Sequence, residues 1–311
     1  MQRPRIAGIL FGSPGAGSFV EAGVLAFARA REQLRANIHL HWMDRSETEW
    51  RIARLREIAA LRPELIVLHG AQGEALVEAL APELPAIMFA VTQGHVLAPN
   101  VACYEVLLEQ AAFLAGALAG WSTRSGVIGH LSGERVRAGL KARAGFAAGV
   151  RFASADARLI STFCGSQHDA ELAARCVAAQ HRAGADIVFT MLGAGRDGAI
   201  RASRELGTQQ IGDGGNWCAT HPDVFLASAI ADSGWGSLRA VQDFLAGELR
   251  TGRRETIGLE DPRVCGLATN SKVGAELRRR VDSLADDILN GAITIPTHWD
   301  GPEYYVREIV N

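Results

Sequence analysis

Short apolar segments alternate with longer amphipathic segments along nearly the whole chain. Residues 6–11 form the first apolar run, and an amphipathic, Ala-rich run follows over 19–34. Short apolar runs are typical of strands buried on both faces of a parallel sheet, and the longer runs are typical of the helices that connect such strands. The alternation therefore predicts an α/β protein built from successive βα units.

The predicted units fall into two series. The first has predicted strands at 6–11, 38–42, 65–68 and 86–90 and predicted helices at 19–34, 47–61, 73–80 and 107–118. The pattern restarts after 121–126, with strands at 127–131, 158–162, 187–191, 209–212 and 224–230 and helices at 139–150, 169–183 and 198–206. The remaining residues add a helix at 238–249, a short strand near 264–267 and a helix at 274–289.

The length of the chain supports two domains. Its 311 residues exceed what a single core usually serves and suit two domains of roughly 150 residues each. The residues after 230 are too few for a third domain, so we predict that they return to complete the first two. The predicted lobes are residues 1–122 with 229–260 and residues 123–228 with 261–311, joined by several hinge crossings.

Charge and cysteine content exclude several classes of protein. Lys and Arg number 32 against 34 for Asp and Glu, a net charge of −2, which does not favour nucleic acid or an anionic membrane as a partner. The five cysteines lie far apart and form no CxxC pair, which argues against a zinc site and a disulfide framework. We expect five small buried residues: Cys103, Cys164, Cys176, Cys218 and Cys265.

The apolar run at 6–11 is too short for a signal peptide or for a membrane span, which needs about 20 residues. We interpret it as the first strand. Two locations follow from this interpretation. The protein is cytoplasmic, or it is periplasmic or lipid-anchored outside the cytoplasm and its export segment is missing from this sequence.

Glycine-rich segments follow the predicted strands, where ligands of open parallel sheets bind. The segment at 12–18 has three interpretations. It lacks the Lys-Ser/Thr of a P-loop and the spacing of a dinucleotide fingerprint, which disfavours phosphate binding. It is a tight turn into a helix capped by Ser18, or a turn that also presents Ser18 and Phe19 to a ligand.

The loop that ends at Trp217 combines a carboxylate, an amide and a large ring on a Gly-rich turn. Asp213 and Trp217 together suit a planar heterocycle, which would stack on the indole and donate a ring N–H to the carboxylate. Alternatively, Trp217 only covers the surface of its lobe. Trp235, after the strand predicted at 224–230, lies either near the ligand or in core and hinge packing.

The sequence shows no enzyme signature. It contains no GxSxG elbow and no HExxH motif, and its nine histidines are not at metal-ligand spacing. His168-Asp169 resembles an acid/base pair, but Asp169 directly precedes a predicted helix and is better interpreted as its N-cap. We therefore predict a binding protein with no catalytic residue, no metal and no cofactor.

The order of several segments resembles the basic membrane protein family, the substrate-binding components of ABC importers that include purine-nucleoside receptor lipoproteins. The similarity covers nearly the whole chain. The segments that carry it are Asn100-Val101, 109–116, 125–129, 144–150, 163–166 with Asp169, 184–189, 211–213 and 288–296.

The resemblance implies a type I periplasmic-binding-protein fold, in which two Rossmann-like lobes with parallel sheets close on a ligand. It implies that Phe19 is one wall of a purine site and that Phe163 or Trp217 is the other. Asp213 matches an acidic residue that the family often uses on ribose hydroxyls.

Two departures from the family pattern bear on the ligand. The family usually has an Asp just before its Ser-Phe pair and an Asn after it, whereas this chain has Gly17 and Val20. Its nucleoside binders carry a Lys after the strand that matches 225–230, whereas this chain has Trp235-Gly236 nearby. The loss of a cation and a carboxylate favours a free nucleobase or another flat heterocycle over a complete nucleoside.

The prediction is therefore a monomeric solute-binding protein of an ABC importer, with a purine-like ligand in the interlobe cleft, a membrane permease as partner and no nucleic acid. The alternatives are a cytoplasmic small-molecule sensor on the same fold and an enzyme that acts on nucleosides or sugars. The candidate ligand-binding residues are Ser13, Ser18, Phe19, Gly70, Gln72, Thr92, Gln93, Tyr104, Phe163, Gly193, Asp213, Asn216, Trp217 and Trp235.

Overall fold

The computed structural model describes residues 3–15 and 18–306, and these divide into two compact units. Unit 1 contains the residues up to Val106 together with Asp232–Ile257, and unit 2 contains Leu107–Ala231 together with the residues from Gly258 onward. The chain passes between the units three times, at 106/107, 231/232 and 257/258. The two-lobed α/β architecture predicted from the sequence is confirmed.

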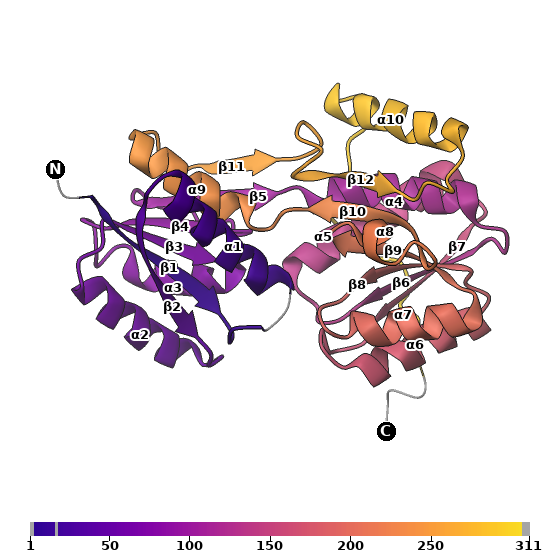
Figure 1. Ribbon diagram of the computed structural model, residues 1–311, viewed down its shortest axis with the longest axis horizontal. Helices are drawn as coiled ribbons and strands as arrows, with labels where there is room; N and C mark the ends of the chain where they lie inside the picture. Colours follow the sequence, from indigo (N-terminus) through magenta and orange to yellow (C-terminus); the bar gives the residue numbers. More distant parts are fainter. Residues whose placement is uncertain (1–2, 16–17, 307–311) are drawn as a thin grey trace. The chain divides into compact units, whose positions relative to one another are not determined.

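Unit 1 is built on a six-stranded parallel sheet in the order β11-β5-β4-β3-β1-β2 (Figure 1). Its strands are β1 (Arg5–Phe11), β2 (Asn37–Met43), β3 (Leu65–His69), β4 (Met88–Thr92), β5 (Val101–Val106) and β11 (Arg254–Ile257). Its helices are α1 (Ser18–Gln33), α2 (Thr48–Ala60), α3 (Glu74–Leu80) and α9 (Trp235–Ala246), with a 3-10 turn at Ala71–Gly73.

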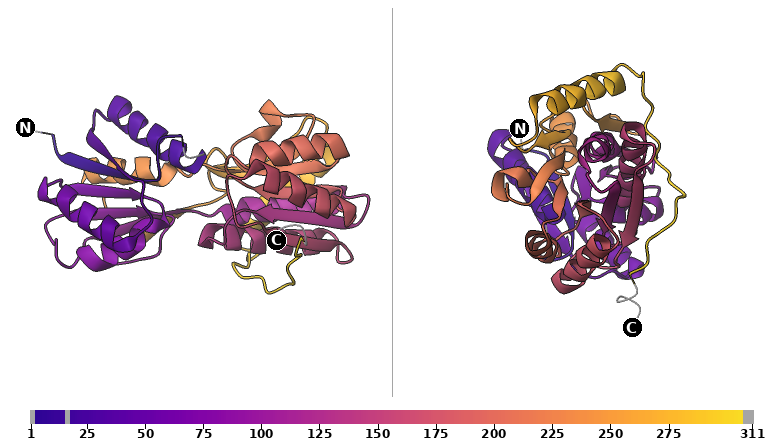
Figure 2. Two further views of the ribbon diagram at one scale, coloured as in Figure 1. Left: turned by 90° about the horizontal axis from the view of Figure 1, so that it is seen from below. Right: turned by 90° about the vertical axis from the view of Figure 1, so that its right-hand side faces the viewer.

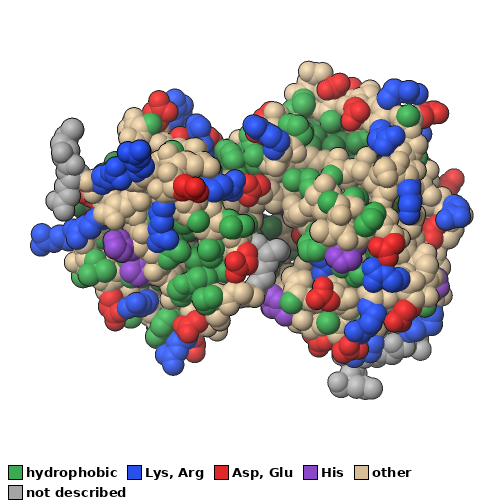
Figure 3. Space-filling view, in the orientation of Figure 1, with side chains coloured by type: hydrophobic (Ala, Val, Ile, Leu, Met, Phe, Trp, Pro, Cys, Tyr) green, Lys and Arg blue, Asp and Glu red, His purple; other side chains and the backbone are tan. Residues whose placement is uncertain are grey.

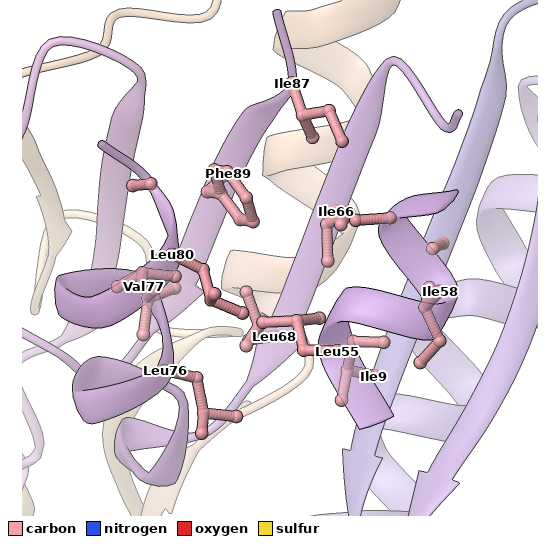
Figure 4. Packing of buried hydrophobic residues seen from close by; sticks show 14 of the residues in the cluster. Ile9, Leu55, Ile58, Ile66, Leu68, Leu76, Val77, Leu80, Ile87 and Phe89 are labelled. Carbon is pink, nitrogen blue, oxygen red and sulfur yellow. The ribbon is translucent and has the colours of Figure 1, made fainter. Parts of the chain in front are cut away.

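Helices cover both faces of this sheet, which explains why its central strands are apolar throughout. On one face α2 and α3 supply Leu55, Ile58 and Leu80, which pack against Ile66 and Phe89 of the strands (Figure 4). On the other face α1 and α9 supply the core residues Phe27, Ala240 and Val241. All five residues of β3 are buried as a consequence.

Unit 2 repeats this design in the order β12-β10-β9-β8-β6-β7, with only β12 antiparallel to its neighbour among the described strands (Figures 1 and 2). Its strands are β6 (Val127–Ser132), β7 (Arg158–Phe163), β8 (Ile187–Met191), β9 (Gln209–Gly214), β10 (Phe225–Ala231) and β12 (Cys265–Thr269). Its helices are α4 (Leu108–Ser122), α5 (Arg137–Ala153), α6 (Ala170–Arg182), α7 (Arg196–Leu206), α8 (Trp217–Thr220) and α10 (Ala275–Leu289).

Glycines allow α4 and α5 to pack with their backbones in close contact. A Cβ atom at Gly116 would overlap the carbonyl oxygen of Phe146, and one at Gly149 would overlap that of Phe113. Only glycine leaves enough room for two helix backbones at this separation. This packing draws α4 into unit 2, so the first boundary lies at 106/107 and not at the predicted 122/123.

Two strands were absent from the sequence-based prediction. The sequence pattern predicts no strand between residues 90 and 107, but 101–106 form the fully buried β5. The other is β11, which has four half-exposed or exposed residues and pairs only with β5 at the edge of the sheet. β5 pairs with β4 as well as with β11, whereas β11 is added from a distant segment of the chain, a long-range contact that local patterns do not report.

The structure also tests several smaller predictions. Asp169 caps α6, because its Oδ1 accepts a hydrogen bond from the Leu172 amide at 2.8 Å. All five cysteines are free thiols, and Cys218 is half-buried while the other four are buried. No helix within residues 3–15 and 18–306 combines the length and apolarity that a membrane crossing requires. Acidic and basic side chains are interspersed on the face shown in Figure 3.

Candidate functional site

The strand orders place one crevice in each unit. In unit 1 the chain runs from β1 outward to β2 and then returns to β3 on the other side of β1. In unit 2 it runs from β6 to β7 and returns to β8. Ligands of doubly wound sheets bind beyond the carboxyl ends of the strands where the order reverses. The two candidate regions are therefore the ends of β1 and β3 and the ends of β6 and β8.

The crevice of unit 1 contains an aromatic pair. Phe19, in the first turn of α1, is 37% exposed, and its ring centroid lies 4.4 Å from that of His69 at an angle of 31°. His69 is the last residue of β3 and is only 1% exposed. An exposed ring with a buried ring beneath it forms a flat platform for a planar ligand.

Hydrogen bonds determine which ring nitrogen of His69 carries the proton. Its Nε2 lies 2.8 Å from the carbonyl oxygen of Phe19, and its Nδ1 lies 2.9 Å from the hydroxyl of Ser237 in α9. A carbonyl oxygen only accepts, so Nε2 carries the proton and Nδ1 accepts from Ser237. Burial lowers the pKa of His69 to about 4, so the ring is neutral near pH 7.

Two glycines make room for this arrangement. A Cβ atom at Gly23 of α1 would lie 2.6 Å from the His69 ring. Gly70 has a φ of 126°, and its amide donates to the Thr92 hydroxyl at 2.9 Å. The side chain of Gln72 lies against Gly70, exposed beside the Phe19 ring. The crevice of unit 1 therefore brings together Phe19, Gly70, Gln72 and Thr92 from the predicted set.

Three other candidate residues of unit 1 lie in the loop after β1, at the start of α1 and directly after β4. Ser13 is exposed in the loop after β1, and Ser18 is the first residue of α1, with its side chain outside the described structure. Gln93 has a φ of 59° and donates its amide to the Tyr104 carbonyl at 2.7 Å.

Tyr104 and Trp235 pack in the core of unit 1. Tyr104 is 2% exposed and donates its hydroxyl to Asp243 at 2.9 Å. Burial and this hydrogen bond raise the pKa of Tyr104. The Trp235 ring meets Tyr104 edge-on at 6.2 Å, which is the packing role that the sequence left open for this tryptophan.

In unit 2, Asp213 at the end of β9 is paired with Arg196, a buried arginine at the start of α7. Arg196 is 3% exposed and also donates to the Leu192 carbonyl at 2.7 Å. Burial raises the pKa of the Asp213 carboxyl, and the adjacent guanidinium opposes that rise. The pairing leaves little net charge at this strand end.

Trp217 is packed onto its own unit. The Arg196 guanidinium lies 4.3 Å from the indole centroid, and the Phe225 ring is stacked with it at 6.1 Å. Its Nε1 donates to the Asp213 carbonyl at 2.8 Å, and a Cβ at Gly212 would lie 2.5 Å from the ring. These contacts match the surface-covering role left open for Trp217, next to an exposed Asn216.

Phe163 lies among arginines at the end of β7. The guanidinium carbons of Arg135 and Arg143 each lie 4.9 Å from its ring centroid. Both arginines pair with one oxygen of Glu303, from the segment after α10 that runs along unit 2 to reach β7 (Figure 2). The half-buried Trp299 lies over Arg143, also at 4.9 Å.

The loop between β7 and α6 fills the crevice of unit 2. The amides of Gly193 and Gly195 both donate to the Gln167 carbonyl at 3.0 Å. A Cβ at Gly193 would lie 2.9 Å from the His168 ring, and one at Gly133 would lie 2.6 Å from the Gln167 side chain. Gly193, from the predicted set, therefore serves the close approach of this loop.

Sequence reasoning missed the polar residues that hold the predicted rings. These are His69, Ser237, Arg135, Arg143, Arg196 and Glu303. One signal was present for His69, which stands between the apolar run of β3 and Gly70. For Arg143 and Glu303 no local signal exists, because their partners lie 160 residues apart.

One serine–histidine pair in unit 1 raises the question of catalysis. The Ser237–His69 pair has the spacing of a nucleophile and its base, but Ser237 has 0% exposure and no path to a substrate. Among residues 3–15 and 18–306 no three His, Cys, Asp or Glu side chains are grouped as metal ligands. The strand ends within the described residues present ring surfaces, amide donors and a carboxylate whose charge is compensated by an arginine.

Comparisons with known proteins give a consistent result. Basic membrane protein A1 of Borrelia garinii subsp. bavariensis is 25% identical over 317 residues, covering 98% of this chain and 92% of the relative. Basic membrane protein A of Borreliella burgdorferi is 24% identical over 319 residues, covering 99% and 92%.

Solved structures agree on the fold. An ABC transporter solute-binding protein from Aeropyrum pernix K1 superimposes with a TM-score of 0.82 at 20% identity, covering 96% of this chain and 94% of that one. A second, from Conexibacter woesei, has a TM-score of 0.72 at 22% identity, covering 96% and 100%.

The family assignment rests on the length of the match as well as on the two-sheet architecture. The model of the PnrA-like ABC transporter substrate-binding proteins matches residues 9–298, almost the whole chain. The fold of the two sheets agrees with that of the solved solute-binding protein from Aeropyrum pernix K1. The chain therefore belongs to the PnrA-like family of ABC transporter substrate-binding proteins.

Proposed function

We propose that this protein captures a small, planar, uncharged heterocycle, a purine nucleobase in the first instance, and delivers it to the permease of an ABC importer. One observation carries the proposal. Phe19 presents an exposed ring at the crevice of unit 1, and the buried, neutral His69 ring lies beneath it. Stacking a base on one aromatic ring contributes roughly 1–3 kcal/mol.

The charges near the predicted second wall support an uncharged ligand. Asp213 is paired with Arg196, so its carboxylate is already compensated and attracts a cation only weakly. At Phe163 the two guanidiniums share the carboxylate of Glu303, which leaves one positive charge, so this cluster does not add to that support. A neutral heterocycle loses less hydration free energy in such surroundings than a charged ligand would.

Two residues of unit 2 remain candidates for the second wall. Phe163 is half-buried, and Trp217 is half-buried with Arg196 over its ring. We propose Phe163 first, because Trp217 already stacks with Phe225 and bonds to the Asp213 carbonyl.

The remaining parts of the proposal concern partners and location. The protein acts as a monomer outside the cytoplasm, without enzymatic turnover, and its partner is a membrane permease. Family membership supports these statements. Stimulation of ATP hydrolysis by the reconstituted permease, dependent on the loaded protein, would test the partnership.

Calorimetric titration tests the ligand. We expect adenine, guanine, hypoxanthine or xanthine to bind more tightly than the matching nucleoside. Phe19→Ala should weaken binding by more than tenfold. Phe152→Ala is the matched control, because Phe152 is also an exposed ring (54%) but lies at the end of α5. Absence of heat with every base and nucleoside, or equal affinities for the two variants, would contradict the proposal.

A further inference from the structure

We propose that His69, as its neutral Nε2–H tautomer, is the positioning residue that holds Phe19 ready for the ligand, and that Ser237 anchors its other ring nitrogen. The inference rests on the proposed function, because it assigns Phe19 to the ligand. In this proposal His69 does not contact the ligand itself. It acts through the residue above it.

The contacts of His69 join three elements of unit 1. The residue ends β3, its ring faces Phe19 of α1 at 4.4 Å, and its Nδ1 meets Ser237 of α9 at 2.9 Å. Its Nε2–H donates to the Phe19 carbonyl oxygen at 2.8 Å. One side chain therefore fixes both the backbone and the ring face of Phe19.

Ser237 completes this chain of hydrogen bonds. It is 0% exposed, so its hydroxyl needs a partner within the protein. Because the Phe19 carbonyl oxygen only accepts, the proton of the neutral imidazole is on Nε2, and Ser237 therefore donates to Nδ1. The opposite tautomer would place a lone pair of Nε2 against the Phe19 carbonyl oxygen, which is repulsive.

The surroundings leave the imidazole no alternative position. Gly23 admits the ring, because any Cβ there would lie 2.6 Å from it. Gly70, next to His69, is held by the Thr92 hydroxyl at 2.9 Å with a φ that side chains rarely adopt. A ring that is held on both nitrogens and packed in this way pre-organises its neighbour, which reduces the ordering cost of binding.

Nitrogen-15 NMR of the whole protein tests the tautomer without any ligand. We expect the His69 ring at pH 7 to show a protonated Nε2 and an unprotonated Nδ1, with proton contacts between the His69 and Phe19 rings. In Ser237→Ala the ring should keep the protonated Nε2, and the Nδ1 resonance should shift because its hydrogen bond is lost. A protonated Nδ1 in the wild-type protein, or no ring contact, would overturn the proposal.

A double-mutant cycle with adenine as the probe tests the positioning role. We expect His69→Leu to weaken adenine binding by roughly tenfold in the wild-type background and to have no further effect in Phe19→Ala. His69→Gln, whose amide can both donate to Phe19 and accept from Ser237, should recover part of the affinity. His181→Leu is the control, because the His181 ring also hydrogen-bonds a hydroxyl group, that of Thr208, but lies on α6 of unit 2.

The outcomes separate the two proposals. If His69→Leu weakens adenine binding equally in both backgrounds, His69 does not act through Phe19 and the positioning role is wrong. If the wild-type protein binds no purine, the proposed function fails while the NMR result still decides the tautomer and the ring contact. If His69→Leu does not fold, His69→Gln and Ser237→Ala take its place in the double-mutant cycle with Phe19→Ala.

Discussion

The guanidinium of Arg196 lies 4.3 Å from the indole centroid of Trp217. The same side chain pairs with Asp213 and donates to the Leu192 carbonyl oxygen. A single arginine, 3% exposed, therefore joins the ends of β8 and β9 to α8. Trp217 is built into unit 2 by this contact, and the carboxylate beside it is not free to take a cationic ligand.

Loss of this arginine should destabilise the protein strongly. Arg196→Met removes the partner of Asp213 and leaves a mostly buried carboxylate, which costs about 3–5 kcal/mol of unfolding free energy. Arg204→Met is the control, because Arg204 and Asp223 are 52% and 53% exposed and such pairs contribute less than about 1 kcal/mol. Urea unfolding of the two variants measures the difference, and equal losses would show that Arg196 is not structural.

The close contacts at glycines between α4 and α5 should contribute to the stability of the protein. Gly149→Ala places a methyl group against the Phe113 carbonyl oxygen, and we expect a loss of about 1–3 kcal/mol in unfolding free energy. Gly274→Ala is the matched control, because nothing lies within 4 Å of a Cβ there and its φ of −59° suits alanine. A thermal shift of similar size in both variants would contradict the close packing.

Stability should fall on mild acidification because two buried histidines are neutral in the folded state. Burial lowers the pKa of His69 to about 4 and that of His130 to about 3. Below the unfolded value of 6.5 the unfolded chain binds protons that the folded protein does not. The stabilising contribution is complete above that value and is lost as the pH falls toward the folded values.

Urea unfolding between pH 5 and 6.5 measures this loss. The wild-type free energy of unfolding should fall about 1.4 kcal/mol per pH unit more steeply than that of His130→Gln. Between pH 7 and 8 the two proteins should show parallel dependence, because both histidines are then neutral in either state. Parallel curves over the acidic range as well would mean that His130 is protonated in the folded protein.

The carboxylate of Glu303 should hold the segment after α10 on unit 2. It pairs with Arg135 and with Arg143, which is 7% exposed, and its neighbour Tyr304 donates an amide to the Ser161 carbonyl at 2.7 Å. Glu303→Gln keeps the shape but removes the charge. We expect a loss of about 1.5–3 kcal/mol in unfolding free energy.

Limited proteolysis reports on the same segment directly. Cleavage after residue 290 should be faster in Glu303→Gln than in the wild-type protein, because the edge of β7 holds the segment less firmly. Glu57→Gln is the control, because Glu57 is 64% exposed and pairs only with its helix neighbour Arg54 in the described contacts. Unchanged cleavage would show that the pairs with Arg135 and Arg143 do not anchor the segment.

Local sequence pattern predicted most of the elements but not how far each extends or which unit holds it. The predicted helix at 107–118 exists as α4, yet its contacts with α5 place it in unit 2. β11 was absent from the prediction because it is a short strand recognised mainly through its pairing with the distant β5. The N-cap at Asp169, by contrast, depends on residues three positions apart and was predicted correctly.

The candidate site divides in the same way. Phe19, Gly70, Gln72 and Thr92 were named from the sequence because they follow strands, and the structure brings them together at one strand edge. Trp235 was also named because it follows a strand, but both Trp235 and Tyr104, another of the named candidates, pack in the core. A strand end is a local feature, whereas the direction of a side chain depends on which face each residue takes in the sheet.

The sequence by itself determined the class of fold, the two-unit organisation and the positions of the strand ends, because the periods of apolar residues in strands and helices are local properties. The tertiary structure alone decided which polar groups serve those strand ends. Ser237 meets His69 across 168 residues of chain, and Arg143 meets Glu303 across 160. Such pairs are set by strand order and helix packing, so no short stretch of sequence records them.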